Sequence, residues 1–451
     1  MNINTIVLAA GEGSRMKSNR AKTLQKIGGK TMLEMICQTA AKVSSKIILI
    51  IGFDKESVIK EFENYDLNII ACEQPEPKGT GDAVKCGVGE AEEADKVLIL
   101  YGDVPLISQD TLQKLIHSSK EGISILTTVL DNPYGYGRVK KDEDGSVTAI
   151  VEEKDATTEE KEIKEIFTGV LCSSINILKD GLNELDNHNA AGEFYLTDIV
   201  SIMSNRGIKV DTHITSNNEV KGANSHVELA ELEAIYRSMN VKDILEMGIT
   251  VSDPARLDVR GRISSGKDCS IDVNVILEGD IKLGDNVSIG PNCVIKNTSV
   301  ANNTKIDAFS HIVGAKIGEG CVIGPYARLR EGSQIEASAK VGNFVETKNI
   351  ILGKGSKANH LTYLGDSTIG KETNIGAGTI TCNYDGKEKH ETVIGDESFV
   401  GSNSALVAPV TIGSNTTIAA GSVITKDVPD NALGLGRAKQ SNKENWSKKK
   451  G

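Results

Sequence analysis

The chain has 451 residues, which is longer than one hydrophobic core usually grows, so two or more domains are expected. Its formal net charge of -11 gives no general attraction to nucleic acid or to anionic membranes, so a phosphorylated substrate would need a local basic pocket. No stretch approaches the roughly eighteen apolar residues of a membrane span. Glycine accounts for 45 residues and aromatics for only 4%, a composition that favours a thin interior over a large aromatic core.

The cysteines and the two ends of the chain bear on its compartment. Eight cysteines are scattered without a CxxC pair, which argues against a zinc site or a disulfide scaffold and favours a reducing cytoplasm. Residues 1–10 lack a basic segment, so a signal peptide is not expected. The basic end, formed by Lys443 and by Lys448 to Lys450, is typical of a solvated tail.

The first motif is the short apolar run Thr5 to Ala10, which is typical of a buried parallel strand. The glycine-rich segment Gly11 to Met16 follows it directly. In such a loop backbone N–H groups can approach phosphate oxygens, and Arg15 offers a forked cation. The segment matches neither a Walker A loop nor a full dinucleotide fingerprint, so a tight turn without a ligand explains the motif about as well when it is taken alone.

Strand-like and helix-like segments then alternate, which predicts an α/β sheet. The helix is expected over 32–43, and strands are expected over 46–51, 67–71 and 96–100. The last strand ends in Tyr101-Gly102-Asp103. Because ligands of open α/β sheets bind beyond the carboxyl ends of the strands, Asp103 could hold Mg²⁺ against a triphosphate. A turn or helix cap is the commoner use of such an aspartate.

A connecting helix is predicted over 227–247. Apolar side chains recur there at gaps of three and four residues, and Gly248 is a plausible stop before Asp253-Pro254. We expect this apolar stripe to pack against the sheet domain; it comprises Leu229, Leu232, Tyr236 and Met239.

In the second half a branched aliphatic residue followed by glycine returns every six residues. Such a hexapeptide period predicts a β-solenoid with coils of eighteen residues and three sides, in preference to the short strands of a sandwich. The clearest pairs are Leu283-Gly284 with Ile289-Gly290, Ile317-Gly318 with Ile323-Gly324, Ile369-Gly370 with Ile375-Gly376, and Ile394-Gly395 with Val400-Gly401.

Polar segments decorate the predicted coils. His360 and Lys348 are twelve residues apart, so they could lie on different faces of one coil, and a site shared between subunits is plausible. A lone histidine is more often a surface residue or coil cap, but Tyr363, Asn383 and Tyr384 add the phenol and amides that a sugar phosphate needs. The six-residue period stops over 381–391, where either a functional excursion or a tolerated insertion is expected.

At this point the chain resembles known families. The first half is similar to sugar-phosphate nucleotidyltransferases, and the repeats resemble left-handed β-helix acyltransferases. Together, in this order, they resemble the family of bifunctional N-acetylglucosamine-1-phosphate uridyltransferases / glucosamine-1-phosphate N-acetyltransferases. The motifs that carry the resemblance are Leu8 to Met16, Lys22, Gly79-Thr80-Gly81, Tyr101-Gly102-Asp103 and the hexapeptide repeats.

The resemblance implies an α/β nucleotidyltransferase domain with a Rossmann-like mixed sheet over 1–226. A connecting helix over 227–250 and a left-handed parallel β-helix with a C-terminal tail over 251–451 follow. It also implies synthesis of UDP-N-acetylglucosamine for cell-envelope polymers. The β-helix would acetylate glucosamine-1-phosphate with acetyl-CoA, and the first domain would then transfer UMP from UTP to the product and release pyrophosphate.

For the uridylyl site the resemblance implies Mg²⁺ held by Asp103 and Asn224. Positive charge and N–H groups would lower the repulsion between two polyanions, so positioning and electrostatics would carry the catalysis. The implied nucleotide and sugar contacts are Leu8, Ala9, Ala10, Gly11, Arg15, Lys22, Gln74, Gly79, Thr80, Tyr101, Gly102, Asp103, Gly137, Glu152 and Asn224.

For the acetyl site the resemblance implies His360 as the general base for the sugar amine, because an ammonium cannot attack a thioester. Beyond the resemblance, we hypothesise that Ser402 helps to stabilise the developing oxyanion. A homotrimer is implied as well. The implied acceptor contacts are Arg330, Lys348, Tyr363 and Asn374. The implied acetyl-CoA contacts are Ala377, Asn383, Tyr384, Ser402, Ala420 and Arg437.

One residue departs from the family pattern. Phe167 stands where the family usually places an asparagine that contacts the sugar, although Thr168 and Gly169 beside it fit. This favours, as an alternative, a nucleotidyltransferase with a solenoid tail that acts on a different sugar-1-phosphate. A catalytically silent solenoid that assembles other proteins is the alternative from another class.

Overall fold

The computed structural model describes residues 2–119 and 122–449. The chain divides into two compact units, the first ending at Tyr236 and the second beginning at Arg237. Of the predicted basic tail, Lys450 lies outside the described residues. Among the described helices none is both long and apolar enough to cross a membrane.

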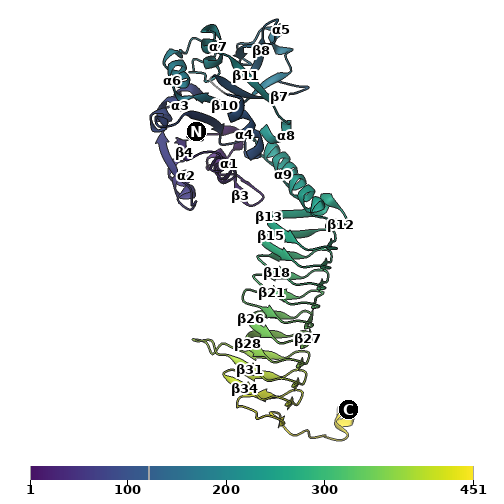
Figure 1. The fold of residues 1–451 in the computed structure, drawn as a ribbon. Coiled ribbons are helices and arrows are strands. Elements are labelled where there is room, and N and C mark those ends of the chain that lie inside the picture. The colour runs from purple at the N-terminus through teal and green to yellow at the C-terminus, as the bar shows by residue number, and fades with distance from the viewer. Residues whose placement is uncertain (1, 120–121, 450–451) are drawn as a thin grey trace. The chain divides into compact units, whose positions relative to one another are not determined.

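The first unit is built on a mixed nine-stranded sheet whose main strand order is β11-β7-β10-β6-β1-β4-β5 (Figure 1). The pairs β1–β4, β1–β6 and β4–β5 are parallel, whereas β10 is antiparallel to β6 and β7. The predicted strands are present, with small differences at their ends. The nine strands are β1 (Ile3–Leu8), β4 (Lys46–Ile51), β5 (Ile69–Glu73), β6 (Lys96–Tyr101), β7 (Ile123–Val129), β8 (Arg138–Lys141), β9 (Val147–Val151), β10 (Glu165–Ser174) and β11 (Val210–Ile214).

Alternate residues of the central strands pack into separate hydrophobic clusters. In β1, Ile6 belongs to one buried cluster and Val7 to another, and Ile99 and Leu100 of β6 divide in the same way. Because successive side chains of a strand point to opposite faces, both faces of the sheet are covered. This explains why the predicted strands are continuous apolar runs, and it leaves the strand ends as the place for a site.

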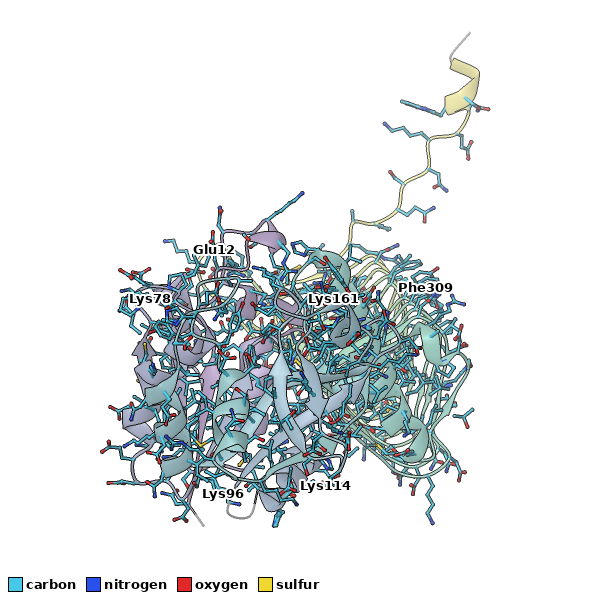
Figure 2. All side chains as sticks on the ribbon, turned by 90° about the horizontal axis from the view of Figure 1, so that it is seen from above. Glu12, Lys78, Lys96, Lys114, Lys161 and Phe309 are labelled. Atoms are coloured by element: carbon cyan, nitrogen blue, oxygen red, sulfur yellow. The ribbon has the colours of Figure 1, made fainter. Side chains whose placement is uncertain are left out.

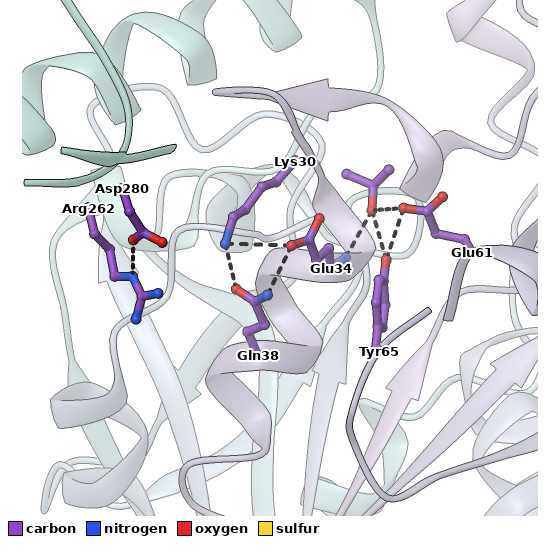
Figure 3. A network of polar contacts seen from close by, with 8 residues as sticks. Lys30, Glu34, Gln38, Glu61, Tyr65, Arg262 and Asp280 are labelled. Atoms are coloured by element: carbon purple, nitrogen blue, oxygen red, sulfur yellow. Dashed lines mark hydrogen bonds and ion pairs between the residues drawn. The ribbon is translucent and has the colours of Figure 1, made fainter. Parts of the chain in front are cut away.

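The helices of the first unit carry ordinary sequence signals at their ends. The Thr31 hydroxyl caps α1 (Met32–Ala40) by accepting the Glu34 N–H at 3.0 Å, and it also contacts Glu61 and Tyr65 (Figure 3). Lys30 and Gln38 complete the polar surface of this helix. The remaining helices are α2 (Lys55–Phe62), α3 (Thr80–Gly87), α4 (Gln109–Ser118), α5 (Thr158–Lys161), α6 (Ile175–Glu184), α7 (Asp198–Asn205) and α8 (Asn217–Val220). The short elements are 3₁₀ turns η1 (Ser14–Met16), η2 (Lys22–Leu24) and η3 (Val88–Ala91) and the hairpin β2 (Lys26–Ile27) with β3 (Lys30–Thr31).

The predicted connecting helix is present as α9 (His226–Glu246). Leu232 is buried in a cluster of the first unit, whereas Val241 and Ile244 are buried in the core of the second. Met239 is 39% exposed, so its predicted packing against the sheet is wrong. The helix ends where Gly248 takes a left-handed conformation with φ of 87°.

The second unit is a parallel β-helix whose strands form three faces. The first face is an 11-stranded sheet, and a 15-stranded sheet covers the second and third (Figure 1). The first sheet contains β12 (Thr250–Val251), β14 (Ser270–Ile271), β16 (Ser288–Ile289), β19 (Lys305–Ile306), β22 (Val322–Ile323), β25 (Lys340–Asn343), β27 (Lys357–His360), β29 (Asn374–Ile375), β32 (Phe399–Val400), β35 (Thr417–Ile418) and β37 (Leu433–Gly434).

The 15-stranded sheet bends around the other two faces. Its long strands are β13 (Leu257–Ser265), β15 (Val275–Leu283), β26 (Glu346–Leu352) and β28 (Tyr363–Ile369). Its strands on the second face are β17 (Val294–Lys296), β20 (His311–Val313), β23 (Arg328–Leu329), β30 (Ile380–Cys382), β33 (Ala405–Val407) and β36 (Val423–Ile424). Those on the third face are β18 (Ser299–Val300), β21 (Lys316–Ile317), β24 (Gln334–Ile335), β31 (Thr392–Ile394) and β34 (Val410–Ile412). The 3₁₀ turns η4 (Pro254–Arg256) and η5 (Trp446–Lys449) flank the strands.

The repeat predicted a uniform coil length of eighteen residues, but the coils differ in length. Ser270 pairs with Ser288, an offset of 18, but Ser288 pairs with Lys305, an offset of 17. The shorter coils lack one residue at a corner: Lys296 lies 18 residues after its partner Glu278, whereas Ser299 lies 17 after Lys282. Across the predicted excursion the offset grows to 25, from Ile375 to Val400.

The aliphatic residues of the repeat point inward as predicted, and their glycines allow the coils to approach. Ile375 is 2% exposed and Val400 is fully buried. A Cβ added to Gly376 would lie 2.5 Å from the carbonyl oxygen of Val400 in the next coil, and one on Gly401 would lie 2.4 Å from the Ala420 nitrogen. Close approach of the backbone, more than a turn, therefore explains these glycines.

Candidate active sites

The first candidate site is a pocket of about 290 Å³ where β1, β5 and β6 end and α3 begins. This is the edge at which parallel sheets bind ligands, and α3 begins there. The predicted nucleotide residues that line the pocket are Leu8, Ala9, Ala10, Gly11, Lys22, Gln74, Gly79, Thr80, Tyr101 and Asp103.

A tight turn brings Gln74 to the start of α3. The Gln74 amide donates to the Gly79 carbonyl at 3.1 Å and to Asp82 at 2.8 Å. Gly79 has φ of 112°, and a Cβ there would lie 2.5 Å from the Phe194 carbonyl oxygen. Only glycine fits such a position, which gives a physical reason for Gly79 beyond any ligand.

Tyr101 is packed between Thr80 and Gly169. A Cβ on Gly169 would lie 2.5 Å from the Tyr101 ring, so glycine at this position makes room for the aromatic side chain. Burial raises the pKa of Tyr101, as do the nearby carboxylates of Glu152 and Asp103, although the Thr80 hydroxyl opposes the shift. Tyr101 therefore forms a neutral wall of the pocket.

The two predicted metal ligands converge on one cation. The Lys22 ammonium donates to Asp103 and, at 3.0 Å, to the Asn224 side-chain oxygen. A carboxylate and an amide oxygen are hard donors of the kind that Mg²⁺ takes, usually with substrate phosphates as its other ligands. These residues therefore fit Mg²⁺ with Lys22 at its side.

Two further predicted residues, Gly102 and Arg15, are not among the residues that line the pocket. The Gly102 N–H donates to the Leu8 carbonyl at 2.9 Å, which joins the two strand ends that border the pocket. Arg15 is exposed on η1.

A second pocket in the first unit, of about 370 Å³, contains Glu152. The Thr197 hydroxyl donates to Glu152 at 3.0 Å, and burial raises the pKa of Glu152 despite that bond. Glu193 lines both pockets, so they adjoin. Thr197 and Glu193 were not predicted as site residues, because both lie on a segment without a recognised motif.

Gly137 directly precedes β8, and Phe167 lies on β10, which pairs with β8. A Cβ on Gly137 would lie 3.5 Å from a Glu152 carboxylate oxygen, and the Gly137 carbonyl accepts the Phe167 N–H at 2.9 Å. The Phe167 side chain is 6% exposed, packs in a hydrophobic cluster and is not among the residues that line this pocket. Its ring therefore belongs to the core.

In the solenoid, strand register places His360 and three of the predicted acetyl-CoA residues in one column at a corner. The reference residues Ala358, Ile375, Val400, Ile418 and Gly434 pair in succession. The residues two positions after them occupy equivalent places on successive coils; they are His360, Ala377, Ser402, Ala420 and Gly436. Arg437 joins this column because its guanidinium donates to the Ala420 carbonyl at 2.9 Å.

His360 is exposed, and its carbonyl accepts the Thr362 hydroxyl at 2.7 Å. Within residues 2–119 and 122–449 no hydrogen bond of its imidazole is seen, so the ring is open to a ligand.

Arg330 and Lys348 follow β23 and Thr347 in register, so they occupy equivalent places on consecutive coils of the second face. Both line a pocket of about 240 Å³, and Arg330 forms an ion pair with Glu346 at 2.9 Å. The ammonium of Lys389 lies beside Lys348 and lowers its pKa. Two adjacent ammonium groups and a guanidinium suit a phosphate. Lys389 was not predicted; its place on the excursion was the only available signal.

Tyr363 and Asn383 meet over Gly365 on the same face. A Cβ on Gly365 would lie 2.4 Å from the Tyr363 hydroxyl and 2.9 Å from the Asn383 amide nitrogen. Asn383 is 7% exposed and donates to Asp366, whereas Tyr384 is 60% exposed. Asn374, by contrast, lies on the first face, so one chain does not bring all predicted acceptor residues onto one face.

A ladder of exposed apolar side chains runs beside the His360 column. Phe309 and Tyr326 stack with ring centroids 4.9 Å apart, Tyr326 and Phe344 follow at 5.2 Å, and Leu361 is the next residue. All four have positive φ, which is uncommon for bulky residues, and each is at least 45% exposed. Figure 2 shows Phe309 at the outer edge of the coils.

Comparison with known proteins agrees with both units. Residues 5–138 match the MobA-like NTP transferase domain family, and residues 266–297 and 391–426 match the bacterial transferase hexapeptide family. The second unit is thus a left-handed parallel β-helix of hexapeptide repeats. The bifunctional protein GlmU of Acinetobacter baumannii is 48% identical over 99% of both chains. Those of Marinobacter nauticus and Francisella philomiragia are 46% and 48% identical, again over 99% of both chains. The chain belongs to the GlmU family of bifunctional proteins.

Proposed function

We propose that each unit carries one of two separable active sites, with residues 1–226 serving uridylyl transfer, 227–250 connecting, and 251–451 serving acetyl transfer. The chain is a bifunctional enzyme of UDP-N-acetylglucosamine synthesis. It acetylates glucosamine-1-phosphate with acetyl-CoA and transfers UMP from UTP to N-acetylglucosamine-1-phosphate. We place both reactions in the cytoplasm.

The observation that carries the uridylyl site is the convergence of Asp103 and Asn224 on Lys22. Asp103 and Asn224 would hold Mg²⁺, which neutralises triphosphate charge when bound. Lys22 would add a cation beside it, and Arg15, which lies on η1 outside the pocket lining, would contact the phosphates once they are bound. These groups bring the two polyanions together, so no protein nucleophile is required.

The acceptor sugar of this reaction would occupy the adjoining pocket. Glu152 would accept hydrogen bonds from sugar hydroxyls, and Gly137 would let the sugar approach the backbone. The shared lining residue Glu193 supports this assignment, since a sugar in one pocket would abut a nucleotide in the other.

In the acetyl site His360 would take the proton from the sugar ammonium as the nitrogen attacks the thioester. Arg330, Lys348 and Lys389 would bind the phosphate, and Tyr363 and Asn374 the sugar. Asn383, Tyr384 and the column Ala377, Ser402, Ala420 with Arg437 would bind acetyl-CoA. The Ser402 hydroxyl would stabilise the developing oxyanion.

We further propose a homotrimer whose acetyl sites are shared between copies. The separation of Asn374 from Lys348 on different faces supports this, and so does the exposed apolar ladder, which a neighbouring copy would cover. Light scattering of the active enzyme should give three copies. An active monomer would contradict this proposal.

Pyrophosphate release from UTP and Mg²⁺ tests the uridylyl assignment. N-acetylglucosamine-1-phosphate should be preferred over glucosamine-1-phosphate and glucose-1-phosphate, because the buried Phe167 ring need not occupy the sugar pocket. Equal or reversed preference would favour the second candidate, a transferase for another sugar-1-phosphate, and would assign Phe167 a role in selecting it.

A further inference from the structure

Arg138 is a nearly buried cation that neither proposed mechanism uses. It opens β8, its side chain is 2% exposed, and its Nη2 donates to a Glu153 carboxylate oxygen at 2.6 Å. Its Nη1 donates to the Tyr136 carbonyl, while its Nε is buried without a partner among the described residues. A guanidinium with so little exposure is tolerated only where its partners are held firmly.

Glu153 also binds the backbone of the chain segment that leads into Arg138. The oxygen that accepts from Arg138 also accepts the Gly135 N–H at 3.1 Å. The other oxygen lies 3.8 Å from the Lys161 ammonium. The segment from Gly135 to Arg138 is therefore tied to Glu153 through one carboxylate.

Two of these tied residues, Gly135 and Glu153, line the proposed acceptor pocket together with Glu152. Gly137 precedes Arg138, and Glu152 precedes Glu153. Arg138 and Val151 are register partners in the β8–β9 hairpin. Gly137 and Arg138 therefore lie at the same end of that hairpin as Glu152 and Glu153. A Cβ added to Gly137 would lie 2.8 Å from Ile150 Cγ2 and 3.5 Å from a Glu152 carboxylate oxygen, so glycine here leaves room for both side chains.

We propose that Arg138 is a positioning residue of the uridylyl acceptor pocket: by tying Tyr136 to Glu153, it fixes Gly137 and Glu152 against the acceptor sugar. The inference rests on the proposed role of that pocket. Both adjacent glutamates line that pocket, and Glu153 in addition holds the arginine.

Arg138 also acts on the charge of Glu152. Burial raises the pKa of Glu152, and the Arg138 cation opposes that rise. Loss of Arg138 should raise this pKa further, and a protonated Glu152 has less capacity to accept hydrogen bonds from the sugar. The charged or titratable groups around Glu152 are Arg138, Asp155, Glu193, Tyr101, Tyr195 and Asp198.

Steady-state kinetics of Arg138→Met and Arg138→Lys test the proposal. In Arg138→Met the KM for N-acetylglucosamine-1-phosphate should rise about tenfold while the KM for UTP stays within about twofold. The acid limb of kcat/KM for the acceptor should move to higher pH in Arg138→Met and stay in place in Arg138→Lys, which keeps the charge. Acetyl transfer in the same preparation reports on the amount of folded enzyme.

Lys141→Met is the matched control, since Lys141 lies on the same strand and pairs with Glu165 at 2.6 Å away from the pocket residues. It should leave both KM values unchanged. Should Arg138→Met fail to fold, Glu153→Gln removes the charge from the partner with little change of shape and should raise the acceptor KM in the same direction.

Glu152→Gln separates the inference from the function on which it rests. If Glu152→Gln leaves the acceptor KM unchanged, the assignment of the pocket is wrong. If Glu152→Gln raises it but neither Arg138→Met nor Glu153→Gln does, the pocket stands and the positioning role is wrong. An equal rise of both KM values in Arg138→Met, without a shifted pH profile, would also reduce Arg138 to a structural residue.

Discussion

In the sheet unit the nucleotide pocket draws together residues as far apart in sequence as Lys22 and Asn224, which are 202 positions apart and in direct contact. In the solenoid, His360 and Ala377 share a column because one coil separates them, and Ser402 and Ala420 repeat the relation. A site residue in the sheet unit is placed by the whole topology. In the solenoid it is placed by counting residues along the repeat.

The difference predicts how each site responds to change. A solenoid site should lose one contribution at a time, because each coil presents its own side chain to the ligand. The sheet site depends on loops that support one another, such as Gly79 against Phe194, so a change in one loop should disturb several contacts. The following experiments either sharpen this contrast or remove it.

The largest effect is expected for His360→Ala. Loss of the general base should reduce acetyl transfer by roughly 10²- to 10⁴-fold. Acetylation of glucosamine-1-phosphate is followed by release of free CoA thiol, and uridylyl transfer is measured in the same preparation. An unchanged acetylation rate would remove His360 from the mechanism.

A smaller effect is expected for Lys389→Met, which tests whether the excursion over residues 381–391 takes part in binding the phosphate of glucosamine-1-phosphate. The KM for glucosamine-1-phosphate should rise about tenfold because one of the two adjacent ammonium groups is lost, and the KM for acetyl-CoA should not change. Lys387→Met, on the same exposed excursion, is the control. Equal effects of both variants would show that only the general charge of the excursion matters.

The sheet unit contains a half-buried acid, Asp198, whose effect on stability can be tested through pH. Burial, with the carboxylates of Asp186, Glu152 and Asp155, raises the pKa of Asp198 to about 6. Because this folded pKa exceeds the unfolded value of 3.8, ionisation opposes folding, and the penalty grows as pH rises through about 6.

Asp198→Asn should therefore stabilise the first unit at pH 7.5 by about 1 kcal/mol, a figure reduced for solvent screening of a half-buried group. The gain should vanish below about pH 4. Thermal unfolding at both pH values provides the measurement, with the exposed Asp180→Asn as control. A gain that is independent of pH would refute the electrostatic explanation.

The smallest effect concerns the solenoid interior. Thr392 is fully buried, and its hydroxyl and that of its register partner Ser367 have no hydrogen-bond partner in the described part of the chain. Thr392→Val should raise the free energy of unfolding by about 0.5–1 kcal/mol, since a nearly isosteric methyl group replaces an unsatisfied hydroxyl.

Thr373→Val is the matched control with the opposite sign, because the Thr373 hydroxyl donates to the Gly395 carbonyl at 2.8 Å. Denaturant unfolding of the two variants should give shifts in opposite directions. Destabilisation by Thr392→Val would mean that its hydroxyl is satisfied in solution.

The features that depend on hydrophobic periodicity were predicted from the sequence. The inward aliphatic residues, the strands at the nucleotide pocket and α9 followed from local patterns. The 17-residue coils did not, because a corner can lose one residue without disturbing the inward positions. Met239 fits the helical period but is exposed. It lies between Leu232, which is buried in a cluster of the first unit, and Val241, which is buried in the core of the second.

The parts of the sites that patterns could not predict depend on tertiary contacts. Thr197 reaches Glu152 across 45 positions, and Lys389 meets Lys348 only because the excursion folds back. The family resemblance supplied residues such as Gln74 and Ala377, whose types alone indicate no chemistry. Arg138 was found only from its contacts and burial.

The central claim, two separable sites in one chain, is tested most directly by assaying both reactions in Asp103→Ala and in His360→Ala. The account predicts that Asp103→Ala loses pyrophosphate release and keeps acetylation, and that His360→Ala shows the reverse pattern. Loss of both activities in either variant, with the fold intact by thermal unfolding, would contradict it.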